Sequence, residues 1–353
     1  MRAVRVLSNG VGPLFKRLRL RKRFIFTLTL ALVAFAPARA DDDWGRRRIA
    51  VDATPLDAFE IGAPSRTRFG ALDYVGGLAL RAEIHRFGGF SSLAFDQTSG
   101  QLISISDHGW WLRAKLVIRD GKPAALTDVE MAPVIGPDGK PVGRTKRFDT
   151  ESLTLHEGIA FVGLERVHEV LRFDLGRDGL AARGHTIPVP AEAKKLSSNQ
   201  SLEAICYAAQ GPARGTLIAI AERARKGENL PTRGFILMGA HKGAFDLKRH
   251  DDFDITDCAF APNGDLIVLE RRFGWFSGLA VRLRKIDPRT IKPDAMLDGI
   301  VLMEAGPGTI IDNMEGLAIS KNEKGETMLT LISDDNFSML QRTVLLQFRL
   351  REE

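Results

Sequence analysis

A short β-hairpin pattern recurs five times along the chain, and it constrains the fold more than any other feature. Each copy opens with a polar or acidic residue, runs through an apolar strand and a glycine-containing turn, and ends its second apolar strand with a carboxylate. The copies span residues 92–107, 151–165, 203–222, 257–270 and 315–334, so their starts are 59, 52, 54 and 58 residues apart. A strand-built repeat of this length is typical of a propeller. The sequence therefore predicts an all-β fold, a single β-propeller.

The number of blades follows from the number of copies. Five copies predict five blades that carry the motif, and the residues before the first copy are long enough to complete a less regular sixth blade. We therefore expect six blades. The segment Tyr74–Arg81 (YVGGLALR) has the pattern of an outer strand, and we expect it to close the ring against the C-terminal blade.

The repeat also predicts where polar chemistry gathers. In an antiparallel hairpin, the start of the first strand and the end of the second lie at the same end of the sheet. Nine carboxylates would then meet at one channel mouth: Glu151, Glu203, Asp257 and Glu315 at the openings, and Asp107, Glu165, Glu222, Glu270 and Asp334 at the closings. Clustered acids repel one another unless cations balance them, and an all-oxygen set favours a hard cation such as calcium. The alternative is that each acid caps its own hairpin or pairs with a nearby arginine.

The fifth copy is the densest in oxygen ligands. The segments DNMEG, residues 312–316, and SDDNF, residues 333–337, bring six Asp, Asn and Glu side chains to the two ends that meet. The predicted metal ligands over all copies are Glu151, Glu203, Asp257, Glu315, Asp334 and Asp335. No catalytic residue is assigned, and His108, which follows Asp107, is interpreted as an exposed loop histidine.

Arginine follows the closing acid in three copies. Arg166, Arg223 and Arg271 each come directly after a glutamate. Because guanidinium groups bind phosphate and carboxylate groups in a bidentate manner, these three are predicted to bind a small anionic ester. The alternative is simple pairing with glutamates of neighbouring blades.

The N-terminal segment has the pattern of a secretory signal peptide. Residues 1–40 contain nine of the 50 basic residues and none of the 44 acids, then the apolar run 24–36 and an Ala-Arg-Ala ending. We expect cleavage before Asp41, an exported periplasmic or secreted protein, and one domain over residues 41–353. The apolar run is short for a membrane span, so no stable span is expected after cleavage, with an uncleaved anchor as the alternative. Without this segment the chain is slightly acidic, which removes the main support for nucleic-acid binding.

The two cysteines, Cys206 and Cys258, are predicted to remain buried thiols. Counted from Glu203 and Asp257, taken as equivalent positions, both lie at odd offsets on inner strands. Equal parity points both side chains the same way around the ring, so a disulfide is possible but less favoured.

Several segments resemble the bacterial "esterase-like activity of phytase" family, also called phytase-like domain proteins. They are FSSLAFDQTSGQLISISDHG, FDTESLTL, NQSLEAIC, LIVLERRF and DNMEGLAI, followed by LISDDNFSMLQRTVLLQF. The resemblance spans roughly residues 75–350. It implies similarity to six-bladed, calcium-dependent propeller phytases and an activity on phosphate or other esters, without implying phytate as the substrate.

The pattern and the resemblance together predict an exported hydrolase that uses a metal, expected to be calcium, to cleave a phosphate or carboxylate ester. Two alternatives stay open: a non-catalytic propeller that binds a ligand or protein, and a lactonase-like calcium propeller. The chain has no P-loop, no G-x-S-x-G elbow and no H-E-x-x-H motif that would favour another class of enzyme.

Overall fold

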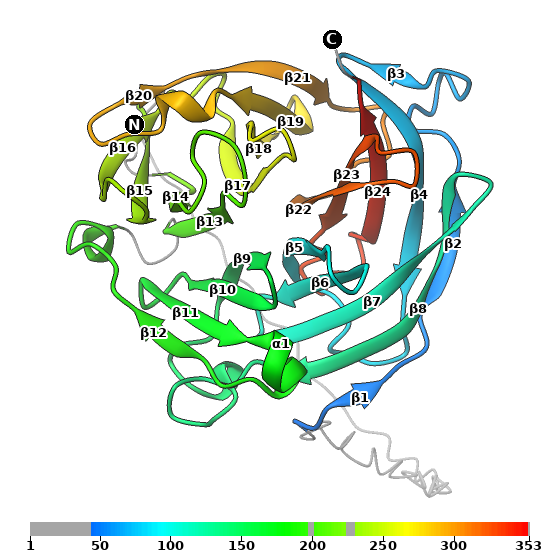
Figure 1. Ribbon diagram of the computed structural model, residues 1–353. Coiled ribbons are helices and arrows are strands. Elements are labelled where there is room, and N and C mark those ends of the chain that lie inside the picture. Colours follow the sequence, from blue (N-terminus) through cyan, green and yellow to red (C-terminus); the bar gives the residue numbers. More distant parts are fainter. Residues whose placement is uncertain (1–43, 197–200, 224–229, 352–353) are drawn as a thin grey trace, which may run out of the picture. The chain divides into compact units, whose positions relative to one another are not determined.

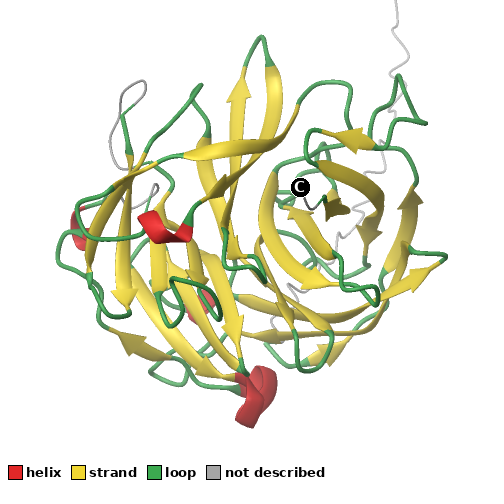
Figure 2. Ribbon diagram, turned by 45° about the horizontal axis from the view of Figure 1, so that its top comes forward, coloured by secondary structure: helices red, strands yellow, loops and turns green. Residues whose placement is uncertain are grey.

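Five β-sheets follow one another along the chain as the blades of a propeller (Figure 1). The computed structural model describes residues 44–196, 201–223 and 230–351. The predicted signal peptide, residues 1–40, lies outside this part of the chain. Helix is confined to single turns such as α1 (Leu175–Asp178), and strands and loops make up the rest (Figure 2). Among the described residues, none of the helices has the length and apolar character that a bilayer crossing requires.

The first three blades come from the N-terminal and middle parts of the chain. Blade 1 contains β5 (Phe90–Asp96), β6 (Gln101–Ser106), β7 (Trp110–Arg119) and β8 (Lys122–Pro133), with β1 (Arg47–Arg48) on its outer edge. Blade 2 contains β9 (Thr150–His156), β10 (Ile159–Leu164), β11 (Glu169–Asp174) and β12 (His185–Ile187). Blade 3 contains β13 (Leu202–Tyr207), β14 (Leu217–Ala221), β15 (Thr232–Met238), β16 (Gly243–Leu247) and β20 (Met296–Leu297).

The last two blades complete the ring. Blade 4 contains β17 (Asp254–Phe260), β18 (Leu266–Gly274), β19 (Gly278–Ile286) and β21 (Gly299–Ala305). Blade 5 contains β22 (Met314–Lys321), β23 (Thr327–Ser333) and β24 (Thr343–Leu350) from the C-terminal part, and β4 (Leu72–Arg81), β2 (Asp52–Leu56) and β3 (Arg68–Phe69) from the N-terminal part. The innermost strands β5, β9, β13, β17 and β22 surround the centre of the ring (Figure 1).

Ring closure is as predicted, but the blade number is not. β4, which contains the predicted segment Tyr74–Arg81, pairs antiparallel with β24 and so joins the two ends of the described chain. The expected sixth blade is wrong, because the N-terminal residues supply β2, β3 and β4 to blade 5 and β1 to blade 1. The three C-terminal strands are completed to a sheet by these partners, and the described residues form five sheets.

The core consists of apolar layers between neighbouring blades. One such cluster packs Ile218 and Ile220 of blade 3 against Leu266 and Val268 of blade 4. Alternate residues of each inner strand face the preceding and the following blade, as the two-residue period of a strand requires. This alternation fixes which side chains can meet across a blade boundary.

The prediction of two free thiols is wrong, because Cys206 and Cys258 form a disulfide between blades 3 and 4, with Cα atoms 5.8 Å apart. The error lies in the register. The residue that corresponds to Glu203 in blade 4 is Thr256 and not Asp257, since both are the residues skipped by a bulge in their inner strands. The two cysteines are therefore three and two positions beyond equivalent residues. Their opposite parity points them toward each other across the blade boundary.

Candidate active site

Every innermost strand carries a β-bulge near its start. The pairing of each inner strand with its neighbour shifts by one residue, and the skipped residues in chain order are Ser91, Glu151, Glu203, Thr256 and Glu315. A bulge re-aims the side chain of the extra residue and ends regular pairing. Three of the five bulge residues are glutamates, and they come from blades 2, 3 and 5.

The residues that end the second strands form a matching set. In four blades an acid at this point, which we call the closing position, donates its backbone N–H to the carbonyl two residues before the bulge; these acids are Asp107, Glu165, Glu222 and Asp334. In blade 4 the register pairs Asp254 with Arg271, so an arginine takes the closing position. The ring of closing residues therefore contains four carboxylates and one guanidinium.

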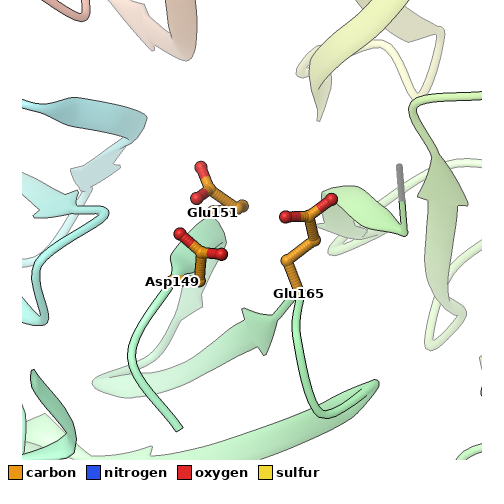
Figure 3. A group of neighbouring side chains, drawn as sticks. All are labelled: Asp149, Glu151 and Glu165. Carbon is orange, nitrogen blue, oxygen red and sulfur yellow. The ribbon is translucent and has the colours of Figure 1, made fainter. Parts of the chain in front are cut away.

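One further carboxylate joins the cluster although the repeat did not identify it. Asp149 lies two residues before the bulge of blade 2, with a positive φ of 79°. Asp149, Glu151 and Glu165 each place a carboxylate oxygen within 4.8 Å of the others, and their side chains point toward one another (Figure 3). The signal in the sequence is the spacing FDTE, but reading it requires the register of the bulge. We call Asp107, Asp149, Glu151, Glu165, Glu203, Glu222, Glu315 and Asp334 the acidic mouth.

Three of these acids titrate near neutrality. Burial, with an added effect of the Asp334 charge, raises the pKa of Asp107 to about 6 although His108 lowers it. Burial also raises the pKa of Glu165 to about 7, against a hydrogen bond from the Ser201 N–H. For Asp334, burial and the nearby Glu315 charge raise the pKa to about 7.

The remaining glutamates of the mouth are shifted in the same direction. Burial is the largest cause for Glu151 and Glu203, followed by the charge of Glu315 for Glu151 and the charge of Glu151 for Glu203, so both pKa values lie well above the ordinary range. Burial also raises the pKa of Glu222 and Glu315, although Arg271 opposes the shift in both. Acids from blades 1, 2, 3 and 5 thus affect one another, as expected if they converge at one end of the ring.

The donor set fits a hard divalent cation. All the side chains of the mouth offer carboxylate oxygens, which is the ligand chemistry of calcium and magnesium. In addition, Oδ1 of Asp107 is buried and has no hydrogen-bond partner among the described residues. A buried carboxylate oxygen without a partner is costly, and a bound cation is one way to satisfy it.

Arg271 is the predicted arginine that reaches the mouth. Its guanidinium contacts Glu315, the side chain of Asn313 and, at 3.5 Å, Oε1 of Glu222. Arg271 therefore links blades 3, 4 and 5 at the end of the ring where the closing positions lie. An arginine in this place balances two of the carboxylates, and a third, Asp149, pairs with Arg166.

The other two predicted arginines pair beside the mouth. Arg166 Nε donates to Oδ2 of Asp149 at 2.6 Å, and its guanidinium lies over the ring of Phe148. Arg223 makes a two-point pair with Asp254, the residue two positions before the bulge of blade 4. Arg223 thus pairs between neighbouring blades, as in the alternative that the sequence left open, although its partner is an aspartate, whereas Arg166 pairs within blade 2 with a member of the mouth.

Asp257 lies one position past the bulge, outside the acidic mouth. Its carboxylate accepts hydrogen bonds from Ser92 Oγ at 2.9 Å and from the Leu317 N–H at 2.8 Å, so it links blade 4 to blades 1 and 5. Burial raises its pKa well above the usual range, although these hydrogen bonds oppose the shift. Thr256 occupies the bulge position of blade 4, where the comparison of the five sequence copies had placed Asp257.

The two adjacent acids of the fifth copy have different surroundings. Asp334 belongs to the mouth, whereas Asp335 turns toward blade 1. Asp335 accepts the Gly89 N–H at 3.0 Å with Oδ1 and the Thr343 hydroxyl at 2.8 Å with Oδ2. Both oxygens of Asp335 therefore already have protein partners. His108 stacks on Phe337 of the same loop, with ring centroids 4.6 Å apart.

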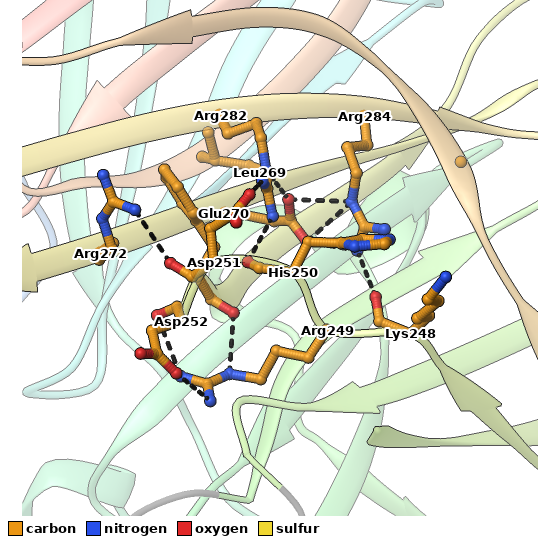
Figure 4. A network of polar contacts seen from close by, with 12 residues as sticks. Lys248, Arg249, His250, Asp251, Asp252, Leu269, Glu270, Arg272, Arg282 and Arg284 are labelled. Atoms are coloured by element: carbon orange, nitrogen blue, oxygen red, sulfur yellow. Dashed lines mark hydrogen bonds and ion pairs between the residues drawn. The ribbon is translucent and has the colours of Figure 1, made fainter. Parts of the chain in front are cut away.

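Glu270, the last acid of the fourth copy, lies inside blade 4. Its carboxylate pairs with Arg282 at 2.7 Å and with Arg284, and all three side chains are at most 2% exposed. Backbone carbonyls of Lys248 and His250 accept further hydrogen bonds from these arginines (Figure 4). The register explains the difference from the other copies, since Arg271 and not Glu270 holds the closing position.

Comparison with known proteins identifies a family. The family model Phytase-like, described as esterase-like activity of phytase, matches residues 85–337. Among solved structures, the crystal structure of an endo-arabinase from Bacteroides thetaiotaomicron VPI-5482 is similar with a TM-score of 0.45 and 11% sequence identity, over 74% of this chain and 95% of that one. The comparison with curated proteins gave no match.

Proposed function

The chain belongs to the Phytase-like family, and from this premise we propose that its acidic mouth is the centre of a cation-dependent hydrolase of phosphate or carboxylate esters. The family and the propeller fold support a hydrolase-type propeller. The observation that carries the proposal is the convergence of carboxylates from four blades. Three of these carboxylates, those of Asp149, Glu151 and Glu165, lie within 4.8 Å of one another. Arg271 is the cation that contacts Glu315 and Glu222.

Calcium is the cation that we propose for this site. Asp149, Glu151 and Glu165 would hold it on one side, and Asp107, whose Oδ1 has no hydrogen-bond partner among the described residues, would be a further ligand. Of the other ligands predicted from the sequence, Glu203, Glu315 and Asp334 belong to the mouth, whereas Asp257 and Asp335 do not. When bound, such a cation polarises an ester oxygen and lowers the pKa of a water molecule.

The side chains of the mouth have separate tasks in this proposal. Arg271 positions the anionic group of the ester by charge-assisted hydrogen bonds. A carboxylate of the mouth that does not bind the cation can take up a proton from the attacking water. Asp257 and Asp335 are proposed to hold the mouth in shape, because their oxygens are occupied by protein donors.

Export is part of the proposal. The disulfide between Cys206 and Cys258 supports it, because disulfides persist in oxidising compartments and are rare in the cytosol. We expect the exported protein to begin at Asp41. The mass of its N-terminal peptide after secretion tests this expectation, and a retained residue 1–40 segment would contradict it.

Turnover of generic esters tests the hydrolase directly. Residues 41–353 are assayed on p-nitrophenyl phosphate and on p-nitrophenyl acyl esters, with calcium and with chelator. We expect calcium-dependent turnover of one ester class and its loss in Glu315→Gln and Asp334→Asn. The matched control is Glu323→Gln, which makes the same change at an exposed hairpin turn at the other end of blade 5.

Two results would overturn the proposal. Full activity in both variants would exclude the mouth as the active site. A calcium-dependent rise in melting temperature without turnover of any ester would favour a binding propeller in which the cation supports the fold.

A further inference from the structure

Two loops at the mouth end of the ring carry fully exposed apolar side chains. The turn between β18 and β19 presents Trp275 and Phe276, which are 90% and 107% exposed. The connection between β23 and β24 presents Met339 and Leu340, at 102% and 95%. Both loops follow closing positions of the mouth, so they rise from the same end of adjacent blades. We call these four side chains the apolar rim.

The two loops that carry these exposed apolar side chains have a defined backbone structure. The β18–β19 pairing continues to Gly274 and Gly278, directly beside the tip, and Phe273 packs edge-on against Trp275 with centroids 5.9 Å apart. In the second loop, the Leu340 N–H donates to Ser338 Oγ, and the Arg342 N–H donates to Asp312. The backbone therefore holds the apolar side chains outward, where water must solvate them at a cost that a partner would remove.

The opposite end of the ring has no such tips among the described hairpin turns. Its turns between first and second strands contain mainly polar and glycine residues, as in QTSG at 97–100, EG at 157–158, PNGD at 262–265 and NEKGE at 322–326. Large apolar side chains at full exposure are thus a feature of the mouth end. Large apolar side chains that are exposed together at one end of a protein indicate an interaction surface.

The chemistry of the rim indicates the kind of partner. Tryptophan, phenylalanine, leucine and methionine on loop tips suit the boundary between lipid head groups and acyl chains. Arg272 lies over the Phe253 ring and donates to the Asp251 carbonyl, and Arg342 pairs with Asp312, so the charges beside the tips are already engaged within the protein and the head groups need not be anionic. A bilayer accepts separate protruding tips without a shaped counterpart, whereas a protein partner needs a matching surface.

We propose that the apolar rim inserts into the surface of a phospholipid bilayer and thereby presents the acidic mouth to it. This is a statement about binding, and it holds whether or not the mouth hydrolyses an ester. Insertion is shallow, since only the tips of two loops take part, so association is reversible.

The protein contains its own reporter for the test. Of the four tryptophans, Trp110 and Trp111 are buried, Trp44 is partly buried, and Trp275 is 90% exposed. Residues 41–353 are mixed with vesicles of phosphatidylcholine and phosphatidylglycerol, and binding is measured by co-sedimentation. We expect a blue shift of the tryptophan emission on binding and its quenching by brominated acyl chains, both of which disappear in Trp275→Phe while co-sedimentation persists.

Serine substitutions then test each loop. We expect Trp275→Ser with Phe276→Ser, and separately Met339→Ser with Leu340→Ser, to lower vesicle binding by about tenfold or more, because burying each side chain contributes more than a tenfold factor in the ideal case. Ile118→Ser and Met296→Ser are controls, because these exposed apolar residues lie at the far end of blade 1 and on the outer edge of blade 3. Melting curves confirm that all variants fold.

Three outcomes would overturn the proposal. They are no binding of the unsubstituted protein to vesicles, unchanged binding when all four rim residues are serine, and a concentration-dependent dimer that the rim substitutions abolish without any vesicle binding. The last outcome would assign the rim to a second copy of the chain.

Discussion

The acidic mouth and Glu270 come from the same repeated hairpin but meet opposite electrostatic surroundings. In the mouth, acids from four blades face one another, and the arginines that contact them are Arg271, at Glu315 and Glu222, and Arg166, at Asp149. Glu270 is nearly inaccessible and is paired with two buried arginines, Arg282 and Arg284. The comparison shows that a carboxylate at a strand end supports the fold where cations of the protein surround it, and demands an external cation where they do not.

Blade 4 is the blade that departs from the others. It has Thr256 at the bulge, Arg271 at the closing position, and its glutamate one residue earlier, inside the sheet. This one-residue difference moves a negative charge away from the mouth and places a positive charge there. The asymmetry gives the mouth one cationic side, which an anionic ester could approach.

The largest predicted effect breaks the compensated region. Replacing the acid in Glu270→Gln removes the buried carboxylate between Arg282 and Arg284 and leaves them only the more exposed Asp251 and Asp298, and we expect it to lower the free energy of unfolding by about 3–5 kcal/mol. Urea denaturation at neutral pH measures the change. Adding calcium should restore none of the lost stability. A destabilisation smaller than that of the exposed control Glu323→Gln would show that the pairs of Glu270 with Arg282 and Arg284 are dispensable.

A second prediction concerns pH in the presence of chelator. Asp107, Glu165 and Asp334 have raised pKa values in the folded protein, so the folded state binds more protons than the unfolded chain between their ordinary and folded pKa values. Stability is therefore greatest at the acidic side of this range and falls as pH rises through the folded pKa values, by roughly 2–4 kcal/mol between about pH 5 and pH 8. Urea denaturation across this range checks the slope. Saturating calcium should flatten it, and a rise in stability with pH would contradict the account.

A third prediction removes the cation of the mouth. In Arg271→Gln, Glu315 and Glu222 lose their positive partner, and we expect the cation-free protein to lose about 2 kcal/mol of stability. Unlike the loss in Glu270→Gln, this one should be largely recovered with calcium, which can take over the balance of charge. Thermal denaturation with and without calcium distinguishes Arg271→Gln from Glu270→Gln. If calcium restored the stability of both variants equally, the proposed difference between the mouth and the surroundings of Glu270 would be contradicted.

The smallest predicted effect relieves the crowding. Glu151→Gln keeps the shape of the side chain and removes one charge, so the cation-free protein should gain about 1 kcal/mol at pH 8. The same variant should respond less to calcium, because a ligand is lost. Denaturation at pH 8 in chelator measures the gain, and a loss of stability would mean that Glu151 is already compensated within the protein.

The repeat in the sequence was sufficient to predict the propeller and the strand that closes it, because period and apolar pattern determine both. It did not determine which blade the N-terminal strands join, since that depends on the sheet that C-terminal strands leave incomplete. The misplacement of Asp257, Glu270 and the two cysteines has a single cause. A bulge adds one residue to a strand without a signal in the local pattern, and a one-residue slip changes the direction of every side chain after it.

The candidate site was predictable in outline for the same reason. Glu151, Glu203, Glu315 and Asp334 follow from the opening and closing positions of the repeat, and the structure brings them together with Asp107, Glu165 and Glu222. Asp149 was missed because its place beside Glu165 depends on backbone pairing across the hairpin. The two oxygens of Asp335 accept hydrogen bonds from Gly89, which is 246 residues away, and from Thr343 of β24, and the contact with Gly89 leaves no local pattern in the sequence.

The most direct test of the account is a calorimetric calcium titration of residues 41–353 at pH 6 and pH 8, in buffers of different ionisation enthalpy. We predict calcium binding that is tighter at pH 8, releases protons at pH 6, and is weakened at least about tenfold in Glu151→Gln with Glu165→Gln but not in Glu323→Gln. Binding that is absent, independent of pH, or unchanged in the double variant would contradict the claim that the uncompensated carboxylates of the mouth form a cation site.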